Sequence, residues 1–350
     1  MSYKNLRIRL KIKRELLKRI GYSPNNYVTL NRAEKASVNF AEKIENYSEV
    51  INQVIYDPRS ERNIGHVFNT RDVFKVTDVI LEPRQGIIYS RDGKLVSEST
   101  NWSTSNLYES FPWNPKRVVS RVKATEVINL TSNAFGHWLV EDLGSILYLT
   151  DRFPNSPILV YRNASRFVLE LLKILDREVI YCNGPTRVNS LLMVTKQEDS
   201  GWMHPKDLDV LEKFRDKVLT KNHRSLERIY ATRRLLKRSP RNENAIENAF
   251  TNQKFTVVRM EELNFIDEIN LVNSTYILAG VSGSWHFNSI WMKNGAQIID
   301  IVNENYWTEL IHRVCFMKSM NYNWFVYKGN FDNEIDIQDL EAFINQVTLK

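Results

Sequence analysis

Strand-like and helix-like segments alternate along most of this chain, and this alternation restricts the fold more than any other feature. Short apolar runs typical of buried strands alternate with amphipathic, helical patterns after about residue 125, whereas residues 35–125 resemble short strands joined by turns. The strands expected from these runs are 73–81, 86–89, 94–96, 157–161, 178–182, 190–195, 228–232, 256–258, 276–280 and 297–301. Strands separated by helices form parallel sheets that carry helices on both faces. The pattern therefore predicts an α/β protein.

The length of the chain indicates more than one domain. A chain of 350 residues exceeds the comfortable size of one hydrophobic core, and 43% apolar residues are typical of a globular protein. The two cysteines, Cys182 and Cys315, provide no disulfide framework, which suits a reducing compartment. The net charge of +7 favours anionic substrates or anionic lipid, and alone says little about nucleic acid.

The most reactive group of side chains lies in the segment 133–142, Asn-Ala-Phe-Gly-His-Trp-Leu-Val-Glu-Asp, at a predicted strand-to-helix turn. On a helix His137 and Glu141 are four residues apart and share a face, whereas Asp142 lies about 100° further round. Two interpretations stay open at this point. The side chains are candidate acid–base groups, or they are acids that suit the helix dipole beside a partly buried histidine.

A second group of candidates follows the predicted strand 228–232. Its cations are Arg233, Arg234, Lys237, Arg238 and Arg241. Arginine binds phosphate oxygens in a bidentate way and stays charged, so this cluster favours a diphosphate site. A basic loop for nucleic acid is the alternative, but aromatic residues are sparsely interleaved here, which disfavours a single-strand binder.

A glycine-containing turn follows the strand 276–280. Such a turn lets backbone amides approach an anion at a helix N-terminus, although many strand-to-helix turns contain glycine. The pair Asp207 and Asp209 has the D-x-D spacing of metal-dependent sugar transferases, but it falls in a helical pattern where the two side chains diverge. We therefore expect no required metal ion or other cofactor.

The amino terminus is basic. Residues 4–19 alternate cations with leucine and isoleucine and lack the long uncharged core of a signal peptide or spanning helix. As a helix, this segment suits binding to anionic lipid, and a basic helix packed on its own domain is the alternative.

These motifs together resemble glycosyltransferase family 61, which includes bacterial capsule and exopolysaccharide transferases. The resemblance covers roughly residues 125–305 and rests on three blocks: 136–142 (GHWLVED), 230–243 from Tyr-Ala-Thr-Arg-Arg to Arg-Asn-Glu, and 280–288 (GVSGSWHFN). Asp300 falls where the family places an acid after the next strand. The chain departs from the family pattern at Ser282, where histidine is usual, and at Trp285, where glycine is usual.

The resemblance implies a GT-B-like architecture, in which two Rossmann-like domains face each other across a cleft. With the basic amphipathic segment placed at 1–20, it implies an acceptor-side domain at 21–205, a nucleotide-sugar domain at 206–335, and a final helix at 336–350 that packs back across the domains. The implied catalytic residues are Glu141 as the first choice of base, then Asp142 and His137. The implied donor-binding residues are Arg233, Arg234, Arg238, Arg241, Asn242, Glu243, Ser282, Gly283, Ser284, His286, Asn288 and Asp300.

The function implied by the resemblance is inverting, metal-independent transfer of a sugar from a nucleotide donor, for example a UDP-linked sugar, to a surface glycan or lipid-linked glycan. We expect a cytoplasmic protein, peripheral on the inner face of the cell membrane through residues 4–19, with no nucleic-acid partner. Two alternatives stay open: a polysaccharide pyruvyl transferase of the same architecture, and a non-catalytic protein that binds glycan or nucleic acid.

Overall fold

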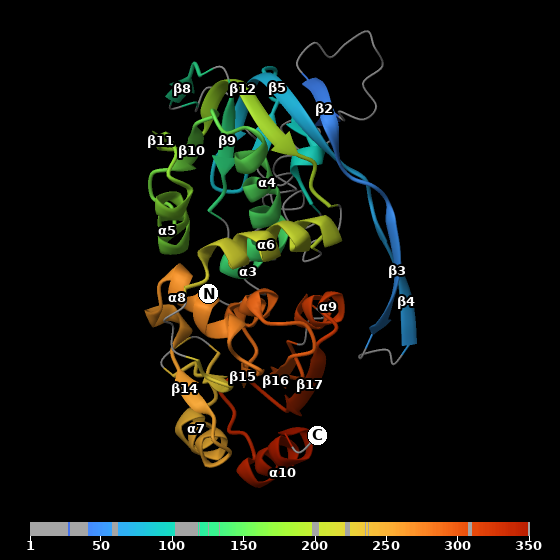
Figure 1. Cartoon of the computed structure of the whole chain (residues 1–350), viewed down its shortest axis with the longest axis vertical. Coiled ribbons are helices and arrows are strands. Elements are labelled where there is room, and N and C mark those ends of the chain that lie inside the picture. The colour runs from blue at the N-terminus through green and yellow to red at the C-terminus, as the bar shows by residue number, and fades with distance from the viewer. Residues whose placement is uncertain are drawn as a thin grey trace, which may run out of the picture. The chain divides into compact units, whose positions relative to one another are not determined.

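The structure is a computed structural model of the whole chain (Figure 1). It describes residues 27–28, 41–57, 62–101, 118, 120–124, 126–132, 134–197, 203–220, 225–234, 236, 238–306 and 310–348. Its contacts divide the chain into two compact units. The first unit comprises residues 1–51 and 67–201, and the second comprises residues 52–66 and 202–350.

The first unit is built on a mixed ten-stranded sheet in the order β1-β7-β6-β5-β12-β9-β10-β11, with β2 paired to β5 and β8 paired to β12. The strands are β1 (Tyr27–Val28), β2 (Ala41–Ser48), β5 (Arg71–Glu82), β6 (Ile87–Tyr89), β7 (Leu95–Val96), β8 (Ser120–Val122), β9 (Val127–Leu130), β10 (Ile158–Tyr161), β11 (Val179–Cys182) and β12 (Thr186–Val194). Strand β12 is antiparallel to β5 and parallel to β9. The sheet therefore changes from antiparallel to parallel pairing at β12.

One long helix and one shorter helix accompany this sheet. The long helix consists of α3 (Phe135–His137), a π-helical segment η4 (Trp138–Leu143) and α4 (Gly144–Arg152), without a break between them. The shorter helix is α5 (Arg166–Leu175), and a single 3-10 turn η2 spans Ser97–Ser99. Leu149 of α4 packs into an apolar cluster with Ile128 and Leu192. The long helix thus begins just beyond the carboxyl end of β9 and covers the sheet.

Strands β3 (Ile51–Asp57) and β4 (Arg62–Phe68) form a separate two-stranded sheet. Nearly all of this ribbon is grouped with the second unit by its contacts, since the boundaries fall after Ile51 and before Val67. An isolated pair of strands is marginally stable by itself.

The second unit contains an all-parallel five-stranded sheet in the order β14-β13-β15-β16-β17. Its strands are β13 (Arg228–Ala231), β14 (Thr256–Val258), β15 (Ile277–Val281), β16 (Gln297–Asn303) and β17 (Asn321–Tyr327). Its helices are α6 (Pro205–Val218), α7 (Glu243–Asn252), α8 (Phe265–Asn273), α9 (Leu310–Met317), α10 (Ile337–Thr348) and the 3-10 segments η5 (Met260–Glu262) and η6 (Ser284–Trp291). Numbered along the chain, the strand order is 2-1-3-4-5, one of the doubly wound orders.

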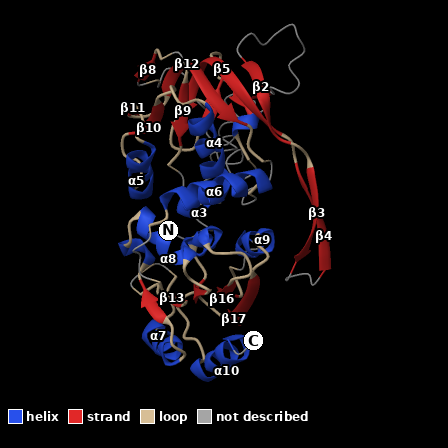
Figure 2. Cartoon of the chain, viewed as in Figure 1, coloured by secondary structure: helices blue, strands red, loops and turns tan. Residues whose placement is uncertain are grey.

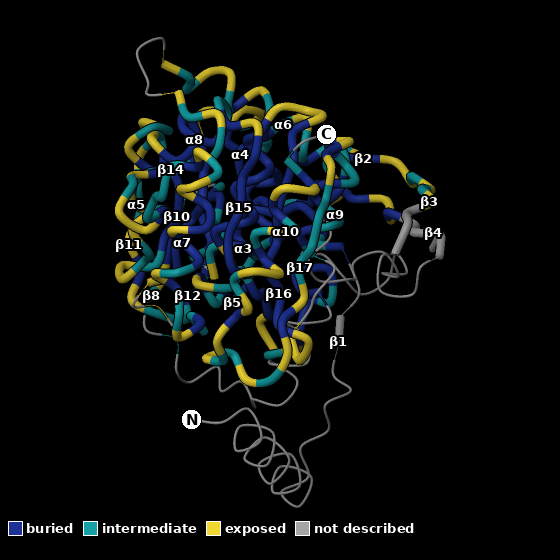
Figure 3. The backbone as a smooth tube through the Cα atoms, turned by 90° about the horizontal axis from the view of Figure 1, so that it is seen from below, coloured by how far each residue is buried: buried dark blue, intermediate teal, exposed yellow. Residues whose placement is uncertain are grey.

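The five-stranded sheet is covered on both faces because its strands are apolar on both faces. Every residue of β15 and β16 is buried, and these strands run through the buried part of the tube in Figure 3. Helices α7 and α10 pack on one face, where Phe250 and Ile344 meet Ile299. Helices α8 and α9 and segment η6 pack together on the other side, so the strands lie between helical layers (Figure 2). Continuous apolar strands of this kind are typical of buried parallel sheets.

The structure confirms a mixed α/β protein with two large sheets, one of them all-parallel. The first sheet differs from the parallel sheet expected after residue 157, because β12 also pairs with β5, more than 100 residues earlier in the chain. Helix α10 packs against α7 and β17 of its own unit. The basic segment 1–20 lies outside the described residues. None of the helices that the structure describes is long and apolar enough to cross a bilayer.

Gly280 is the position where the second sheet has least room for a side chain. A Cβ atom there would lie 2.6 Å from the carbonyl oxygen of Ala231 and 2.4 Å from the indole of Trp285. We predict that Gly280→Ala lowers the free energy of unfolding by about 3 kcal/mol, since overpacking against a fixed backbone atom is costly. Gly295→Ala is the control: its Cβ would meet nothing, and it would lose only about 1 kcal/mol from its left-handed backbone, φ 77°. Equal losses in urea unfolding would contradict this account.

Candidate functional site

The first candidate group lies on the long helix that begins beyond β9. A π-helical turn spans Trp138–Leu143, and Glu141 and Asp142 both belong to it. π-Helical turns interrupt the regular spacing of a helix and are frequent at functional sites. Trp138 and Leu139 are fully buried and anchor this turn, which leaves both acids at the inner side of the helix.

His137 and Glu141 form a hydrogen-bonded pair. Nδ1 of His137 lies 2.7 Å from Oε1 of Glu141, and the other oxygen, Oε2, accepts a 2.7 Å hydrogen bond from the side-chain amide of Asn101. The Glu141 side chain is 4% exposed, whereas that of His137 is 38% exposed. An ionised carboxylate only accepts hydrogen bonds, so Nδ1 carries the proton and Nε2 is the basic nitrogen.

The hydrogen bond that His137 donates to Glu141 raises the pKa of His137 above its usual value, and partial burial of the ring opposes this shift. The carboxylate also fixes the tautomer and the orientation of the ring. A half-exposed imidazole oriented by a buried carboxylate can take a proton from a substrate hydroxyl.

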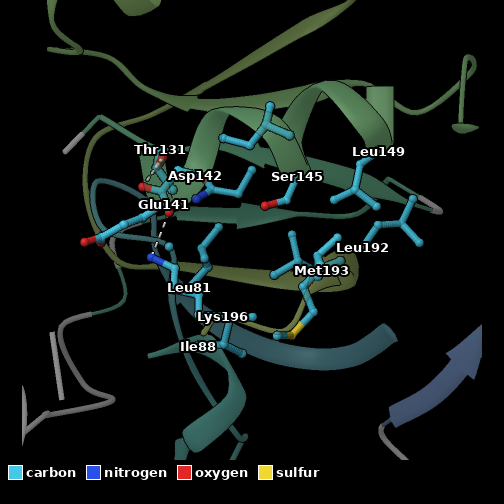
Figure 4. A pocket seen from close by; sticks show the side chains of 15 residues that line it. Leu81, Ile88, Thr131, Glu141, Asp142, Ser145, Leu149, Leu192, Met193 and Lys196 are labelled. Atoms are coloured by element: carbon cyan, nitrogen blue, oxygen red, sulfur yellow. Dashed lines mark hydrogen bonds and ion pairs between the residues drawn. The ribbon is translucent and has the colours of Figure 1, made fainter. Parts of the chain in front are cut away.

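Asp142 occupies a separate, more deeply buried position. Its Oδ2 accepts a 2.9 Å hydrogen bond from Thr131, and its Oδ1 lies 2.9 Å from Nζ of Lys196 (Figure 4). Burial raises the pKa of the Asp142 carboxyl, and the charge of Lys196 opposes the shift. Lys196 follows β12 and Thr131 follows the neighbouring strand β9. Asp142 of the long helix therefore connects the ends of two neighbouring strands. This arrangement makes Asp142 an ion-pair partner rather than an exposed base.

A cavity of about 60 Å³ lies beside Asp142, with polar groups at one end and apolar side chains elsewhere (Figure 4). Its lining comprises Leu81, Gly86, Ile88, Asn129, Thr131, Glu141, Asp142, Ser145, Ile146, Leu149, Leu191, Leu192, Met193, Val194 and Lys196. This space admits ordered water, but it is well below the roughly 300–1,000 Å³ of pockets that enclose organic ligands.

The second candidate group lies at the carboxyl edge of the five-stranded sheet, within the second unit. In the strand order 2-1-3-4-5, the direction in which the chain moves across the sheet reverses between the first and third strands. These strands are here β13 and β15. Ligands of open α/β sheets bind outside the carboxyl ends of strands at this switch point. Arg233 follows β13, and the turn Ser282–Ser284 follows β15, so the sequence positions both at this edge.

Arg233 and the glycine turn are in direct contact. Nη1 of Arg233 donates a 2.8 Å hydrogen bond to the carbonyl oxygen of Ser282. A Cβ atom on Gly283 would lie 1.8 Å from the same nitrogen, so only glycine leaves room for the guanidinium here. Burial lowers the pKa of Arg233, and the nearby positive charge of Arg238 lowers it further. Two cations thus concentrate positive potential at the switch point.

The loop that holds Arg233 is fixed by two buried acids of α7. Glu243 accepts hydrogen bonds from the hydroxyl of Tyr230 at 2.9 Å and from the backbone N–H of Arg233 at 2.9 Å. Glu247 binds the side chains of Thr232 and Arg234. Glu243, which the sequence predicted to bind the nucleotide-sugar donor, therefore shapes the backbone beneath Arg233. The side chain of Arg234 is bound by Glu247.

Two other residues predicted to bind the nucleotide-sugar donor instead contact groups of this chain that lie away from the turn. Arg241 is exposed and forms an ion pair with Asp332 at 2.9 Å. The amide of Asn242 donates to the carbonyl of Ile335 and accepts from its N–H, at 2.7 and 3.0 Å. These contacts tie the loop after β13 to the segment that leads into α10.

The polar residues of the third motif are divided between the surface and the interior. Ser284 is exposed, whereas His286 and Asn288 are fully buried in η6 and Asp300 is 1% exposed. Oδ2 of Asp300 accepts a 2.8 Å hydrogen bond from Tyr322, and Oδ1 lies 3.4 Å from Nε2 of His286. Burial raises the pKa of Asp300 to about 7 and lowers the pKa of His286 to about 3, so both favour their neutral forms. Asp300 also forms a hydrogen bond with the side chain of Ser282, so it supports the turn, and all three of these side chains are buried.

The departure at Trp285 has a packing explanation. Its indole lies against Gly280, its Nε1 donates to the carbonyl of Val281 at 3.1 Å, and it stacks on His286. The ring belongs to the core of the turn rather than to an open pocket.

Sequence reasoning missed Asn101 and Lys196. Lys196 had a usable signal, because it directly follows the predicted strand 190–195, whose end lies at the same edge as the histidine turn. Asn101 lies 40 residues from Glu141 and follows no periodic segment, so no local pattern indicates it. Among the residues that the structure describes, no group of three or more His, Cys, Asp or Glu is placed to hold a metal ion.

The pair geometry predicts how His137 titrates. Its pKa, followed by NMR of the ring proton and assigned with His137→Gln, should lie above 6.5 in the native protein. Glu141→Gln removes the carboxylate that stabilises the imidazolium, so the pKa should fall. A titration unchanged by Glu141→Gln would contradict the pairing.

Comparison with known proteins extends over both candidate groups. Residues 135–299 match the sequence model of the family described as Glycosyltransferase 61. No curated protein matches the chain. The matched range begins at α3 and ends in β16, so it includes the His137–Glu141 pair and the Arg233–Gly283 contact. It favours glycosyl transfer over the pyruvyl transfer and non-catalytic binding that the sequence left open. Residues 135–299 are therefore a glycosyltransferase family 61 domain, and this protein is a glycosyltransferase.

Proposed function

We propose that the protein is an inverting, metal-independent glycosyltransferase that moves one sugar from a nucleotide sugar to a surface glycan or lipid-linked glycan. UDP-linked sugars are one donor class that fits. The two units would correspond to a GT-B arrangement, with the acceptor on the 21–205 side and the donor on the 206–335 side. The observation that carries the proposal is the contact of Arg233 with the Ser282–Gly283 turn at the switch point of a parallel sheet.

The donor half of the proposal rests on the positive charge that is fixed at the edge of the second sheet. A nucleoside diphosphate leaves with additional negative charge on its terminal phosphate, and fixed cations stabilise that charge in the transition state. Arg233 is held in one orientation by Ser282 and by the Glu243-bound loop, so little reorganisation is needed. Arginine can therefore fill the part that a divalent ion plays in metal-dependent transferases.

The acceptor half rests on the His137–Glu141 pair. In a single displacement the acceptor oxygen bonds to the anomeric carbon, the bond from that carbon to the diphosphate oxygen breaks, and the hydroxyl proton leaves. Nε2 of His137 is the atom best suited to take that proton, since the ring is half-exposed and Glu141 holds its other nitrogen. Glu141, the first choice of base from sequence, becomes the residue that orients His137, and Asp142 pairs with Lys196.

The proposed location rests on the basic segment 4–19, in which cations alternate with leucine and isoleucine. Such a segment suits the anionic inner face of a cell membrane. We propose a cytoplasmic, peripheral protein with no nucleic-acid partner.

The donor site can be tested with UDP and with inorganic pyrophosphate by calorimetry. Arg233→Ala should weaken both ligands by about 1.5–3 kcal/mol, because a charge-assisted contact to phosphate is lost. Gly283→Ala should weaken both as well, since its Cβ displaces the Arg233 guanidinium without reaching fixed backbone. The matched control is Arg228→Ala, at the amino end of the same strand. Unchanged affinity in folded Arg233→Ala protein would refute the donor site.

The base can be tested by turnover as a function of pH. His137→Gln should lower kcat by about 10²–10⁴-fold, the usual contribution of general base catalysis. Glu141→Gln should lower it less and move the acid limb of the pH profile to lower pH, because the base is active only when neutral and its pKa falls. Asp142→Asn should leave the position of that limb nearly unchanged. A greater loss in Glu141→Gln than in His137→Gln would return the base to Glu141.

A further inference from the structure

An exposed aromatic group lies at the same carboxyl edge of the five-stranded sheet and has no part in the proposal above. Tyr306 follows β16, Phe331 follows β17, and their rings meet edge to face with centroids 5.5 Å apart. Tyr306 is 47% exposed, although its ring is a large apolar surface. The guanidinium carbon of Arg238 lies 4.6 Å from the centre of the Tyr306 ring and 5.9 Å from that of Phe331.

The two loops that carry these rings are fastened together by their backbones and amides. Asn303 and Asn305 both donate to the carbonyl oxygen of Gly329, at 3.2 and 2.8 Å. Glu304 accepts a 2.7 Å hydrogen bond from the N–H of Gly329. This network fixes Tyr306 in place even though its ring is exposed, which is expected of a surface that binds a partner rather than of a mobile loop tip.

Arg238 is held in an unusual backbone conformation. Its φ of 66° is left-handed, a region that arginine seldom adopts and that costs roughly 1–2 kcal/mol. Strained residues of this kind concentrate at functional sites. The charge of Arg238 is also close enough to Arg233 to lower the pKa of Arg233, so both arginines act on one region of the edge.

We propose that Tyr306 is the platform on which the nucleobase of the donor stacks, and that Arg238 occupies this face until the base arrives. The inference rests on the proposed function, because it needs a nucleoside diphosphate at the Arg233 turn. A guanidinium is planar and stacks on aromatic rings as a base does. When the base replaces it, Arg238 turns to the diphosphate and joins Arg233 as a second cation.

The chemistry selects a planar heterocycle. The separation of 4.6 Å between Arg238 and the ring leaves no layer between them, so the base replaces the guanidinium instead of inserting beneath it. Stacking on an aromatic side chain tolerates any base, so Tyr306 supplies affinity for nucleotides and little choice among them. A sugar ring is the competing occupant, and ligands that contain no donor sugar distinguish it.

The test compares nucleoside diphosphates, which carry a base, with inorganic pyrophosphate, which carries none. Binding of UDP, GDP, ADP and CDP, and of inorganic pyrophosphate, is measured by calorimetry on the full chain. The tightest nucleotide is then used with Tyr306→Ala, Tyr306→Phe, Arg238→Ala and a control, Tyr276→Ala. Tyr276 is 51% exposed, like Tyr306, but precedes β15 at the amino edge of the sheet.

Tyr306→Ala should weaken the nucleotide by about 10- to 100-fold, the usual effect of removing one stacking ring, and should leave pyrophosphate unchanged or tighter. Tyr306→Phe keeps the ring and should stay within about threefold, a difference below 1 kcal/mol. Arg238→Ala should weaken both ligands, and Tyr276→Ala neither.

Three results would overturn the inference. Equal losses of affinity for nucleotide and pyrophosphate in folded Tyr306→Ala would make the role of Tyr306 structural. Unchanged nucleotide affinity in this variant would show that the nucleobase binds elsewhere. Nucleotides that bind no more tightly than pyrophosphate to the native protein would show that no base is recognised. A native protein that binds neither ligand would instead refute the donor site at Arg233, so failure of the proposed function is recognised separately.

Discussion

The carboxylate of Glu243 holds together the part of the second unit on which the account depends. It accepts hydrogen bonds from Tyr230 in the sheet and from the backbone of Arg233 just beyond it. Because this acid is buried, replacing it would leave several donors without partners in a site that excludes water, which is costly. The loop after β13 is therefore rigid where it presents Arg233 to the Ser282–Gly283 turn. Glycine at position 283 is the complementary requirement, since any side chain there would occupy the place of the guanidinium.

Much of the second unit could be predicted from the sequence because its signals are local. The strands at 228–232 and 297–301 are short, mainly apolar runs, and the next helices along the chain are α7, which begins at Glu243, and α9, which begins at Leu310. The first sheet could not be predicted in this way. Its central strand pair joins Leu191 to Val76. Whether these strands pair parallel or antiparallel depends on contacts distant in sequence. The result is a mixed sheet where the alternation after residue 157 indicated a parallel one.

The candidate site shows the same division between local and distant information. The i, i+4 spacing correctly predicts that His137 and Glu141 meet. It does not reveal which of them faces solvent, because Glu141 is bound by Asn101, 40 residues earlier in the chain. Asp300 illustrates a second limit: on a strand covered by helices on both faces, even the residue that alternates away from the main core is buried. Family position alone could not separate residues that touch a ligand from those that support the turn.

We propose that the second unit binds the donor and that the first removes the proton, and both proposals follow from what surrounds the charged groups. Arg233 and Arg238 share one edge, where the charge of Arg238 lowers the pKa of Arg233, whereas Lys196 in the first unit is already paired with Asp142. A crystal structure with a bound nucleoside diphosphate tests this division most directly. The account predicts the diphosphate against the guanidinium of Arg233 and the Ser282–Ser284 turn. A diphosphate bound by Lys196 beside Asp142 would contradict it.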